Sequence, residues 1–356
     1  MNSKIKVLVV DDSAVYRKII TKTISQDPQI EVVGTAANGR IAIDLINRLK
    51  PDVVTLDLEM PEMNGLETLD YLNKLNMNIG IIVFSSHSQA GAKMTFDALE
   101  KGAFDFVPKP SNNSFSQNIN KIASLLVPKI KICYVKKRSA ITANRHFHKI
   151  ISKSKPLPKA LSLPIRKKEA VAIGVSTGGP SALKELLSNL DPHIAVPIFI
   201  VQHMPPVFTS QFAERLDKLC RLKVKEAENG ELVKAGVIYI APGDYHMEVN
   251  NKDRIVKIRL HKGPPENNCR PAVDVLFRSV AEVYNGKTLA IILTGMGSDG
   301  LKGAKVLKEK GAYIIAQDES SSVVWGMPKA VVEAGLADKV VPLYQVPKFI
   351  SDMVKK

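Results

Sequence analysis

Residues 6–12 read KVLVVDD, an apolar run that ends in two adjacent aspartates. A short run of branched apolar residues is typical of a strand buried on both faces of a parallel sheet. Further strand-like runs follow, and helical patterns alternate with them. We expect the other strands at 31–36, 53–56, 79–85 and 105–108, and helices starting near Ser13, Gly39, Gly65, Ala92 and Asn118. This alternation predicts a doubly wound α/β domain over residues 1–128.

A basic segment follows this domain. Residues 129–168 contain ten Lys and three Arg with no Asp or Glu, include three prolines and show no sustained period. This composition predicts a flexible interdomain linker. Of the net charge of +15, only about +2 remains for the rest of the chain. The charge therefore does not indicate a nucleic-acid-binding face, although weak attraction to acidic partners stays open.

A second series of strands and helices begins after the linker. We expect strands at 170–175, 196–202, 237–241, 289–294 and 313–317, with a hairpin formed by Glu248 and residues 255–260. The pattern predicts a second α/β domain over residues 169–356, in keeping with a length of 356 residues.

The chain lacks the sequence features of an exported or membrane-inserted protein. The apolar run after Lys6 is too short for a signal peptide, and no stretch approaches the length that spans a bilayer. Three widely spaced cysteines predict neither a disulfide framework nor a zinc site; they are Cys133, Cys220 and Cys269. We therefore expect a cytoplasmic protein.

Acidic side chains follow two strands of the first predicted domain. Asp11 and Asp12 come directly after the first strand, and Asp57 after the third. In an open α/β sheet the carboxyl ends of the strands form the binding site, so these carboxylates should converge there. A hard cation such as Mg²⁺ relieves their repulsion and lets one of them attack phosphorus. Two adjacent aspartates also commonly cap a helix, which is the alternative interpretation.

Ser85 and Lys109 end the next two strands, and capping does not explain the whole set. Residues 1–128 resemble the response-regulator receiver domain. The resemblance implies that a histidine kinase phosphorylates Asp57, that Asp11, Asp12 and Asp57 hold Mg²⁺, and that Ser85 and Lys109 sense the phosphoryl group. One position departs from the family pattern: the switch residue is Phe106, which has no hydroxyl.

The segment GVSTGGP at 174–180 lies where a strand gives way to a helix. Its glycines permit a sharp turn, and Ser176 would sit at the helix N-terminus, where backbone amides stabilise an oxyanion. A phosphate-binding glycine turn is an equally good interpretation of this segment alone. A serine nucleophile needs a histidine base and a carboxylate to orient it.

His203 directly follows an apolar strand, and Asp299 follows another. With Ser176 they would share one rim of a parallel sheet. The order Ser, His, Asp differs from that of the α/β-hydrolases, so the chemistry would be convergent on another scaffold.

Residues 170–345 resemble the catalytic domain of the chemotaxis protein-glutamate methylesterases. The motifs that carry the resemblance are IGVSTGG at 173–179, QHMPP at 202–206, IAPGD at 240–244 and ILTGMGSDG at 292–300. The resemblance implies that Ser176 is the nucleophile, His203 the base and Asp299 the orienting carboxylate. It further implies that Thr177 and Met296 border the active-site cleft, and that this domain needs no cofactor.

The two resemblances together imply a flavodoxin-like receiver joined to a Rossmann-like methylesterase domain. They imply a monomer that acts on the cytoplasmic domain of methyl-accepting chemoreceptors, demethylating glutamates and deamidating glutamines, with inhibition relieved by phosphorylation. Three alternatives are disfavoured by the sequence: a DNA-binding output domain, an adaptor with a decayed triad, and a thiol enzyme. For the last, neither Cys220 nor Cys269 has a supporting histidine nearby in the sequence.

Overall fold

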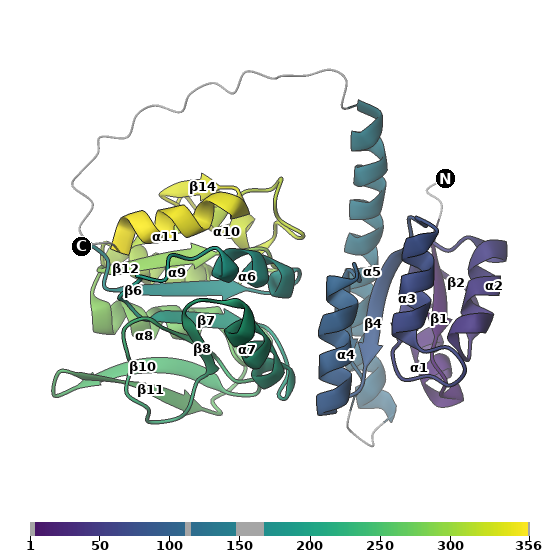
Figure 1. The fold of residues 1–356 in the computed structure, drawn as a ribbon, viewed down its shortest axis with the longest axis horizontal. Helices are drawn as coiled ribbons and strands as arrows, with labels where there is room; N and C mark the ends of the chain where they lie inside the picture. The colour runs from purple at the N-terminus through teal and green to yellow at the C-terminus, as the bar shows by residue number, and fades with distance from the viewer. Residues whose placement is uncertain (1–3, 111–114, 147–166, 355–356) are drawn as a thin grey trace. The chain divides into compact units, whose positions relative to one another are not determined.

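The computed structural model describes residues 4–110, 115–146 and 167–354. The chain divides into two compact units, Met1–Leu157 and Pro158–Lys356, and each is described here by itself. Figure 1 shows a parallel sheet with helices in each unit. The predicted pair of doubly wound α/β domains is thus confirmed.

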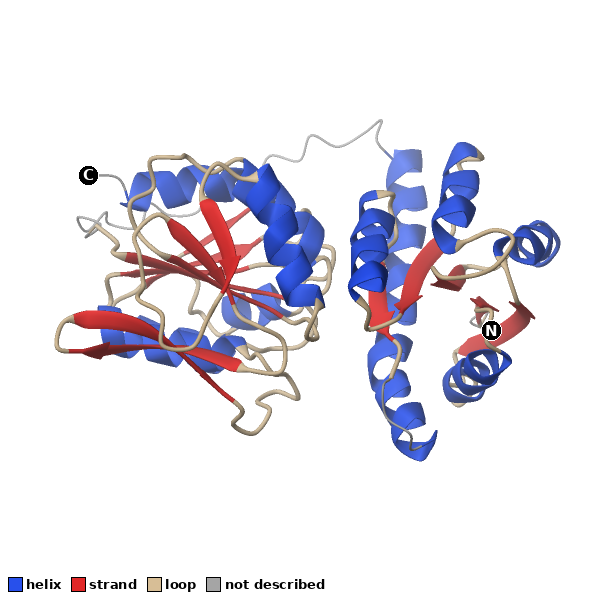
Figure 2. Ribbon diagram, turned by 60° about the horizontal axis from the view of Figure 1, so that its bottom comes forward, coloured by secondary structure: helices blue, strands red, loops and turns tan. Residues whose placement is uncertain are grey.

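The first unit is a five-stranded parallel sheet in the order β2-β1-β3-β4-β5. Its strands are β1 (Ile5–Val10), β2 (Ile30–Ala36), β3 (Val53–Asp57), β4 (Gly80–Ser85) and β5 (Asp105–Pro108). Its helices are α1 (Ala14–Ile24), α2 (Gly39–Leu49), α3 (Gly65–Lys74), α4 (Gln89–Glu100) and α5 (Phe115–His146). In Figure 2 the helices lie on both sides of the strands. The strand order switches at β1 and β3, so the carboxyl ends of these two strands mark the expected site.

Helix α5 extends well beyond the end expected for the first domain. Sequence analysis places the start of the linker at residue 129, but the helix continues to His146 across Pro128. Ile130 and Cys133 are fully buried in the core of the first unit, and Lys129 pairs with Asp105. Sequence analysis did not recognise this part of the helix, because its buried apolar residues alternate with basic ones. Residues 147–166 of the expected linker lie outside the described residues.

The second unit contains a seven-stranded parallel sheet in the order β14-β13-β12-β6-β7-β9-β8. Its strands are β6 (Ala170–Val175), β7 (Ile198–Gln202), β8 (Lys223–Glu226), β9 (Val237–Ile240), β12 (Thr288–Ile292), β13 (Tyr313–Gln317) and β14 (Lys339–Val341). The expected hairpin forms as β10 (His246–Lys252) and β11 (Ile255–His261). Edge strands β8 and β14 were not predicted, because they are short and carry charged or exposed residues.

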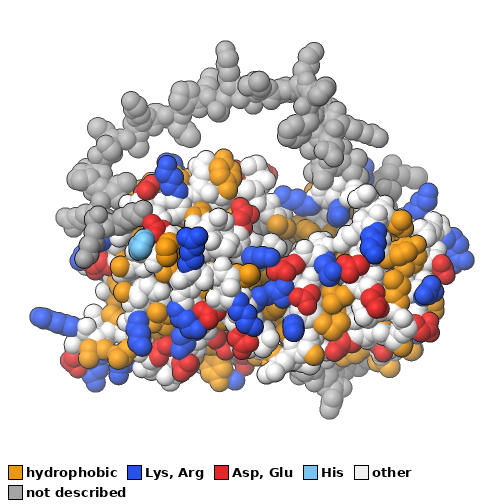
Figure 3. Space-filling model, viewed as in Figure 1, with side chains coloured by type: hydrophobic (Ala, Val, Ile, Leu, Met, Phe, Trp, Pro, Cys, Tyr) orange, Lys and Arg blue, Asp and Glu red, His pale blue; other side chains and the backbone are white. Residues whose placement is uncertain are grey.

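Helices cover both faces of this sheet (Figures 1 and 2). They are α6 (Gly179–Ser188), α7 (Phe208–Leu219), α8 (Val273–Tyr284), α9 (Leu301–Glu309), α10 (Met327–Glu333) and α11 (Val346–Val354), with a 3₁₀ turn η1 (Leu343–Gln345). A parallel sheet of this kind is unlike the all-helical or winged output domain of the DNA-binding alternative. On the face shown in Figure 3, basic and acidic side chains of the described residues are interspersed.

Strands β6, β7 and β12 lie side by side at the centre of the second sheet, with β6 between the other two. The chain leaves β6 toward β7 on one side and later returns to β12 on the other, so the strand order switches here. The three segments that follow these strands therefore meet at one carboxyl edge of the sheet.

Candidate active site

The acidic pocket of the first unit lies at the carboxyl ends of its strands. Asp11 directly follows β1, Asp57 is the last residue of β3, and Lys109 directly follows β5. The Lys109 ammonium lies 2.6 Å from Asp57 Oδ2 and 3.1 Å from Asp11 Oδ2. Both carboxylates are buried, whereas Asp12 is exposed. The structure thus brings these four predicted residues together.

The three aspartates fit a divalent cation. Asp11, Asp12 and Asp57 present oxygens that all lie within 4.8 Å of one another. Asp11 Oδ2 is buried and has no hydrogen-bond partner among the described residues, although it lies at ion-pair distance from Lys109. Burial raises the pKa of Asp11 to about 6, and burial raises the pKa of Asp57 as well. A hard cation such as Mg²⁺ would satisfy the orphaned oxygen and stabilise both charged carboxylates.

Ser85 is the last residue of β4, which lies beside β3 in the sheet. Its Oγ donates to Gly91 O at 3.1 Å, at the start of α4. Its carbonyl accepts from the Lys109 amide at 2.7 Å, so the two residues are joined through their backbones. Phe106 is buried within β5. The phosphoryl-sensing role of Ser85 remains a prediction.

Ser176 directly follows β6 and begins the turn into α6. Gly178 has φ +79°, which side-chain-bearing residues rarely adopt, and Pro180 occupies the first turn of the helix. A Cβ on Gly179 would lie 1.8 Å from Gln202 Oε1 and 2.8 Å from Val175 Cγ2, so a larger residue would have to displace both side chains. The glycines therefore let the turn pass close to the end of β7.

The turn presents backbone amides beside the serine. In the described part of the chain, the amides of Thr177 and Gly178 make no hydrogen bond. A Cβ on Gly295 would lie 2.9 Å from Ser176 Cβ, so the segment containing Met296 borders the serine. Met296 is 37% exposed, whereas Thr177 is buried. These free amides at a helix N-terminus can stabilise an oxyanion.

His203 directly follows β7, next to the serine turn. Its amide donates to Val175 O at 3.2 Å. Gln202 Nε2 donates to the carbonyls of both Ser176 and His203, at 3.1 and 3.2 Å. Gln202 thus ties the backbones of the two residues together. Sequence analysis gave it no role, although it lies in the QHMPP motif.

Asp299 is buried and contacts the histidine directly. His203 Nε2 lies 2.7 Å from Asp299 Oδ2, which also accepts from the Val273 amide at 2.7 Å. Asp299 Oδ1 accepts three hydrogen bonds of 2.8–3.1 Å, from Asn267 Nδ2 and from the amides of Asp274 and Gly300. All hydrogen-bond partners of this carboxylate among the described residues are N–H groups, so the charged form of Asp299 is strongly favoured.

Ser176 makes no hydrogen bond to His203 in the described part of the chain. The second ring nitrogen, Nδ1, instead lies 3.6 Å from Cys269 Sγ. The expectation that Cys269 has no supporting histidine is therefore wrong. The contact could not be seen in the sequence, because the two residues are 66 positions apart. Sequence analysis also missed Asn267.

The electrostatic environment strongly favours a charged histidine. Burial lowers the pKa of His203, but the contacts with Asp299 and Cys269 raise it to about 9. Burial opposes the ionised form of Asp299, yet its hydrogen bonds, led by that of His203, hold the pKa of the carboxyl below its usual range. Both shifts favour an ion pair between the two side chains.

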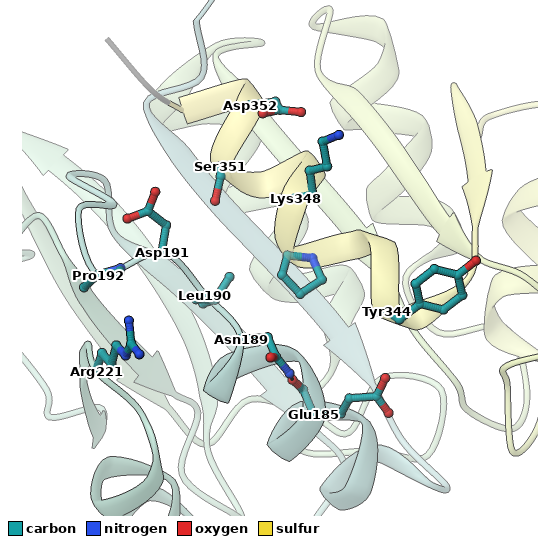
Figure 4. A pocket seen from close by; sticks show the side chains of 11 residues that line it. Glu185, Asn189, Leu190, Asp191, Pro192, Arg221, Tyr344, Lys348, Ser351 and Asp352 are labelled. Atoms are coloured by element: carbon teal, nitrogen blue, oxygen red, sulfur yellow. Dashed lines mark hydrogen bonds between the residues drawn. The ribbon is translucent and has the colours of Figure 1, made fainter.

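A cavity of about 660 Å³ lies elsewhere in the second unit (Figure 4). Its walls come from the C-terminal half of α6 and the segment that follows it, from Arg221 after α7, and from η1 and α11; they include Glu185, Tyr344 and Lys348. Ser176 lies at the opposite end of α6, so this cavity is separate from the site of Ser176, His203 and Asp299. No helix within the described residues is long and apolar enough to cross a membrane.

Residues 171–350 match the CheB methylesterase family, and residues 7–119 match the response regulator receiver domain family. A protein-glutamate methylesterase/protein-glutamine glutaminase of Nocardioides sp. is 46% identical over 96% of this chain and 93% of its own. One of the same name from Desulfotalea psychrophila is 45% identical over 99% of each chain. The crystal structure of the Thermotoga maritima CheB methylesterase catalytic domain is 49% identical, with a TM-score of 0.52, over 52% of this chain and 99% of that one. The chain therefore belongs to the CheB methylesterase family and combines its catalytic domain with a response-regulator receiver domain.

Proposed function

We propose that this protein hydrolyses γ-methyl esters of glutamate, and deamidates glutamines, on the cytoplasmic domain of chemoreceptors. The observation that carries the proposal is the meeting of Ser176, His203 and Asp299 at the carboxyl ends of three adjacent parallel strands. The names of the relatives, protein-glutamate methylesterase/protein-glutamine glutaminase, supply the substrate class.

The chemistry begins with the histidine as general base. Asp299 accepts a hydrogen bond from the Nε2–H of His203, which leaves Nδ1 to take the proton of Ser176. The serine oxygen attacks the ester carbonyl, and the amides of Thr177 and Gly178 receive the negative charge that develops on its oxygen. Protonated His203 then gives its proton to the departing methanol. Water repeats the cycle and releases glutamate; a glutamine substrate releases ammonia instead.

The receiver domain would regulate this reaction. We propose Asp57 as the phosphoacceptor, a histidine kinase as the donor and Mg²⁺ as the cation held with Asp11 and Asp12. The bound cation would neutralise charge on the phosphoryl oxygens. Lys109 already lies 2.6 Å from Asp57 Oδ2, where it can hold a phosphoryl oxygen. Phosphorylation would relieve inhibition of the esterase in a cytoplasmic, monomeric protein.

The direct test is methanol release from the methylated cytoplasmic domain of a chemoreceptor. We expect release that depends on enzyme concentration and stops when the receptor methyl esters are exhausted. An unmethylated receptor with glutamine at the same positions should release ammonia. Absence of both products would contradict the proposed function.

Asp57→Asn should remove activation by a small-molecule phosphodonor. With acetyl phosphate and Mg²⁺, we expect wild-type methanol release to rise about tenfold, a coupling typical of two linked sites. The variant should not respond, because an amide cannot accept the phosphoryl group. Asp52→Asn is the matched control: Asp52 precedes the same strand, β3, and caps the Lys6 amide far from the pocket. Activation that persists in Asp57→Asn would exclude Asp57 as the phosphoacceptor.

A further inference from the structure

A four-residue turn, Glu266–Cys269, lies beside the His203–Asp299 pair. Its ends exchange two backbone hydrogen bonds of 3.1 and 2.9 Å. Its central residues, Asn267 and Asn268, have φ +52° and φ +60°, the backbone of a type I′ turn. Asparagine tolerates this conformation better than most residues with a side chain. The local sequence therefore favours the observed turn.

The turn is fixed to the rest of the domain at both ends. Glu266 accepts two hydrogen bonds from Arg278 of α8, at 2.8 and 2.6 Å. On the other side, Arg270 Nε donates to Asp244 at 3.0 Å. Paired guanidinium–carboxylate contacts of this kind fix orientation as well as distance. The side chains of the turn are thus held at set positions against the catalytic pair.

Two of these side chains contact the two members of the pair. Asn267 Nδ2 donates to Asp299 Oδ1 at 2.8 Å and to Asp274 Oδ2 at 2.9 Å. Cys269 Sγ lies 3.6 Å from His203 Nδ1, within range of a sulfur hydrogen bond. One short turn therefore contacts both the carboxylate and the free nitrogen of the base.

We propose that Asn267 and Cys269 are positioning residues of the esterase: Asn267 fixes the Asp299 carboxylate, and Cys269 caps the His203 nitrogen that must accept the serine proton. Nδ1 has a single position for a hydrogen, so Cys269 and Ser176 compete for it. The contact with Cys269 belongs to the resting state of the site. For catalysis, Nδ1 must exchange its hydrogen bond with the thiol for one with the hydroxyl of Ser176.

The charges around the ring agree with this arrangement. The groups that face His203 are Asp299 and Cys269, and Glu266 of the same turn is already paired with Arg278. Burial lowers the pKa of His203, and its contacts with Asp299 and Cys269 raise it to about 9. A histidine with this pKa is mostly protonated at pH 7, so only a small neutral fraction can act as a base. Release of the Cys269 contact moves the histidine toward its active, neutral form.

This inference rests on the proposed triad, and Cys269→Ala tests it through the pH profile of kcat/KM for methanol release. Because the base must be neutral, activity falls as the pH drops through the pKa of His203. We expect the variant to lose activity at a pH about one unit lower than wild type, and to be about tenfold more active at pH 7. Cys220→Ala, at a partly exposed cysteine of α7's C-terminus, should keep the wild-type profile. An unchanged profile in Cys269→Ala would overturn the capping role.

Asn267→Gly tests the other half of the proposal. Glycine keeps the positive φ and removes the amide that holds Asp299, so kcat should fall about tenfold with KM unchanged. Asn268→Gly is the matched control, because it relaxes the same turn but removes a side chain with no hydrogen bond among the described residues. Equal losses in the two variants would show that only the turn backbone matters and would overturn the role of Asn267.

NMR titration of His203 separates this inference from the proposed function. The full-length protein carries Ser176→Ala, so no catalysis is involved, and His203→Gln identifies the signal among seven histidines. We expect Cys269→Ala to lower the measured pKa of His203 whether or not the triad performs esterolysis. A pKa that does not move would overturn the capping role, even if methanol release depends fully on Ser176.

Discussion

Replacing Ser176 with alanine is expected to lower methanol release by at least about a thousandfold, the loss typical of removing a serine nucleophile. The substitution removes only the hydroxyl, which makes no hydrogen bond within the described residues, so the fold should be unaffected. The turn is held by backbone contacts instead, such as that of the Ser176 amide with Thr294 O at 3.0 Å. The measurement is methanol release from methylated receptor, with thermal unfolding to confirm the fold.

Ser181→Ala is the control for this substitution. Ser181 lies in the first turn of α6 and is exposed. It should keep wild-type activity. If Ser176→Ala also retains activity, the nucleophile is another group, and Cys269 becomes the first candidate because it contacts His203.

The residues at the ends of strands were predictable from sequence. A short apolar run followed by a polar side chain marks the carboxyl end of a buried strand, and parallel strands bring these ends to one edge. This local pattern was enough to select Asp57 and Lys109 in one sheet, and Ser176 and His203 in the other. Asp299 was found in the same way, although seven positions separate it from the end of β12.

The residues that contact His203 and Asp299 from the turn at Glu266–Cys269 could not be predicted in this way. The pair Asn267-Asn268 indicates a turn, but nothing in the local pattern says which side chains that turn contacts. Its position depends on Arg278 of α8, 12 positions after Glu266, and on Asp244 after β9, 26 positions before Arg270. The C-terminal part of α5 was missed for a related reason, because its buried residues alternate with basic ones. In both cases the tertiary contacts of the segment, which the local pattern does not show, decide its position.

Asp299→Asn is expected to lower methanol release about 10⁴-fold, because it disturbs the tautomer of His203. Both oxygens of Asp299 face only donors, including the Val273 amide and Asn267 Nδ2. The side-chain amide of the introduced asparagine can adopt two orientations, and in each of them its NH₂ faces another N–H donor. If the NH₂ faces His203, Nε2 becomes an acceptor, the proton moves to Nδ1, and the nitrogen that should receive the serine proton is occupied.

If the NH₂ instead faces Asn267, three donors lose their acceptor, and a buried donor left in this way costs about 1–3 kcal/mol. Asp299→Asn should therefore also lower the melting temperature, which a purely catalytic carboxylate would not do. Asp318→Asn is the matched control: Asp318 follows the neighbouring strand β13 and accepts from Ser320 and Ser321, with no contact to His203. Methanol release close to wild type in Asp299→Asn, with the melting temperature lowered, would reduce Asp299 to a structural residue and leave His203 to act without an orienting carboxylate.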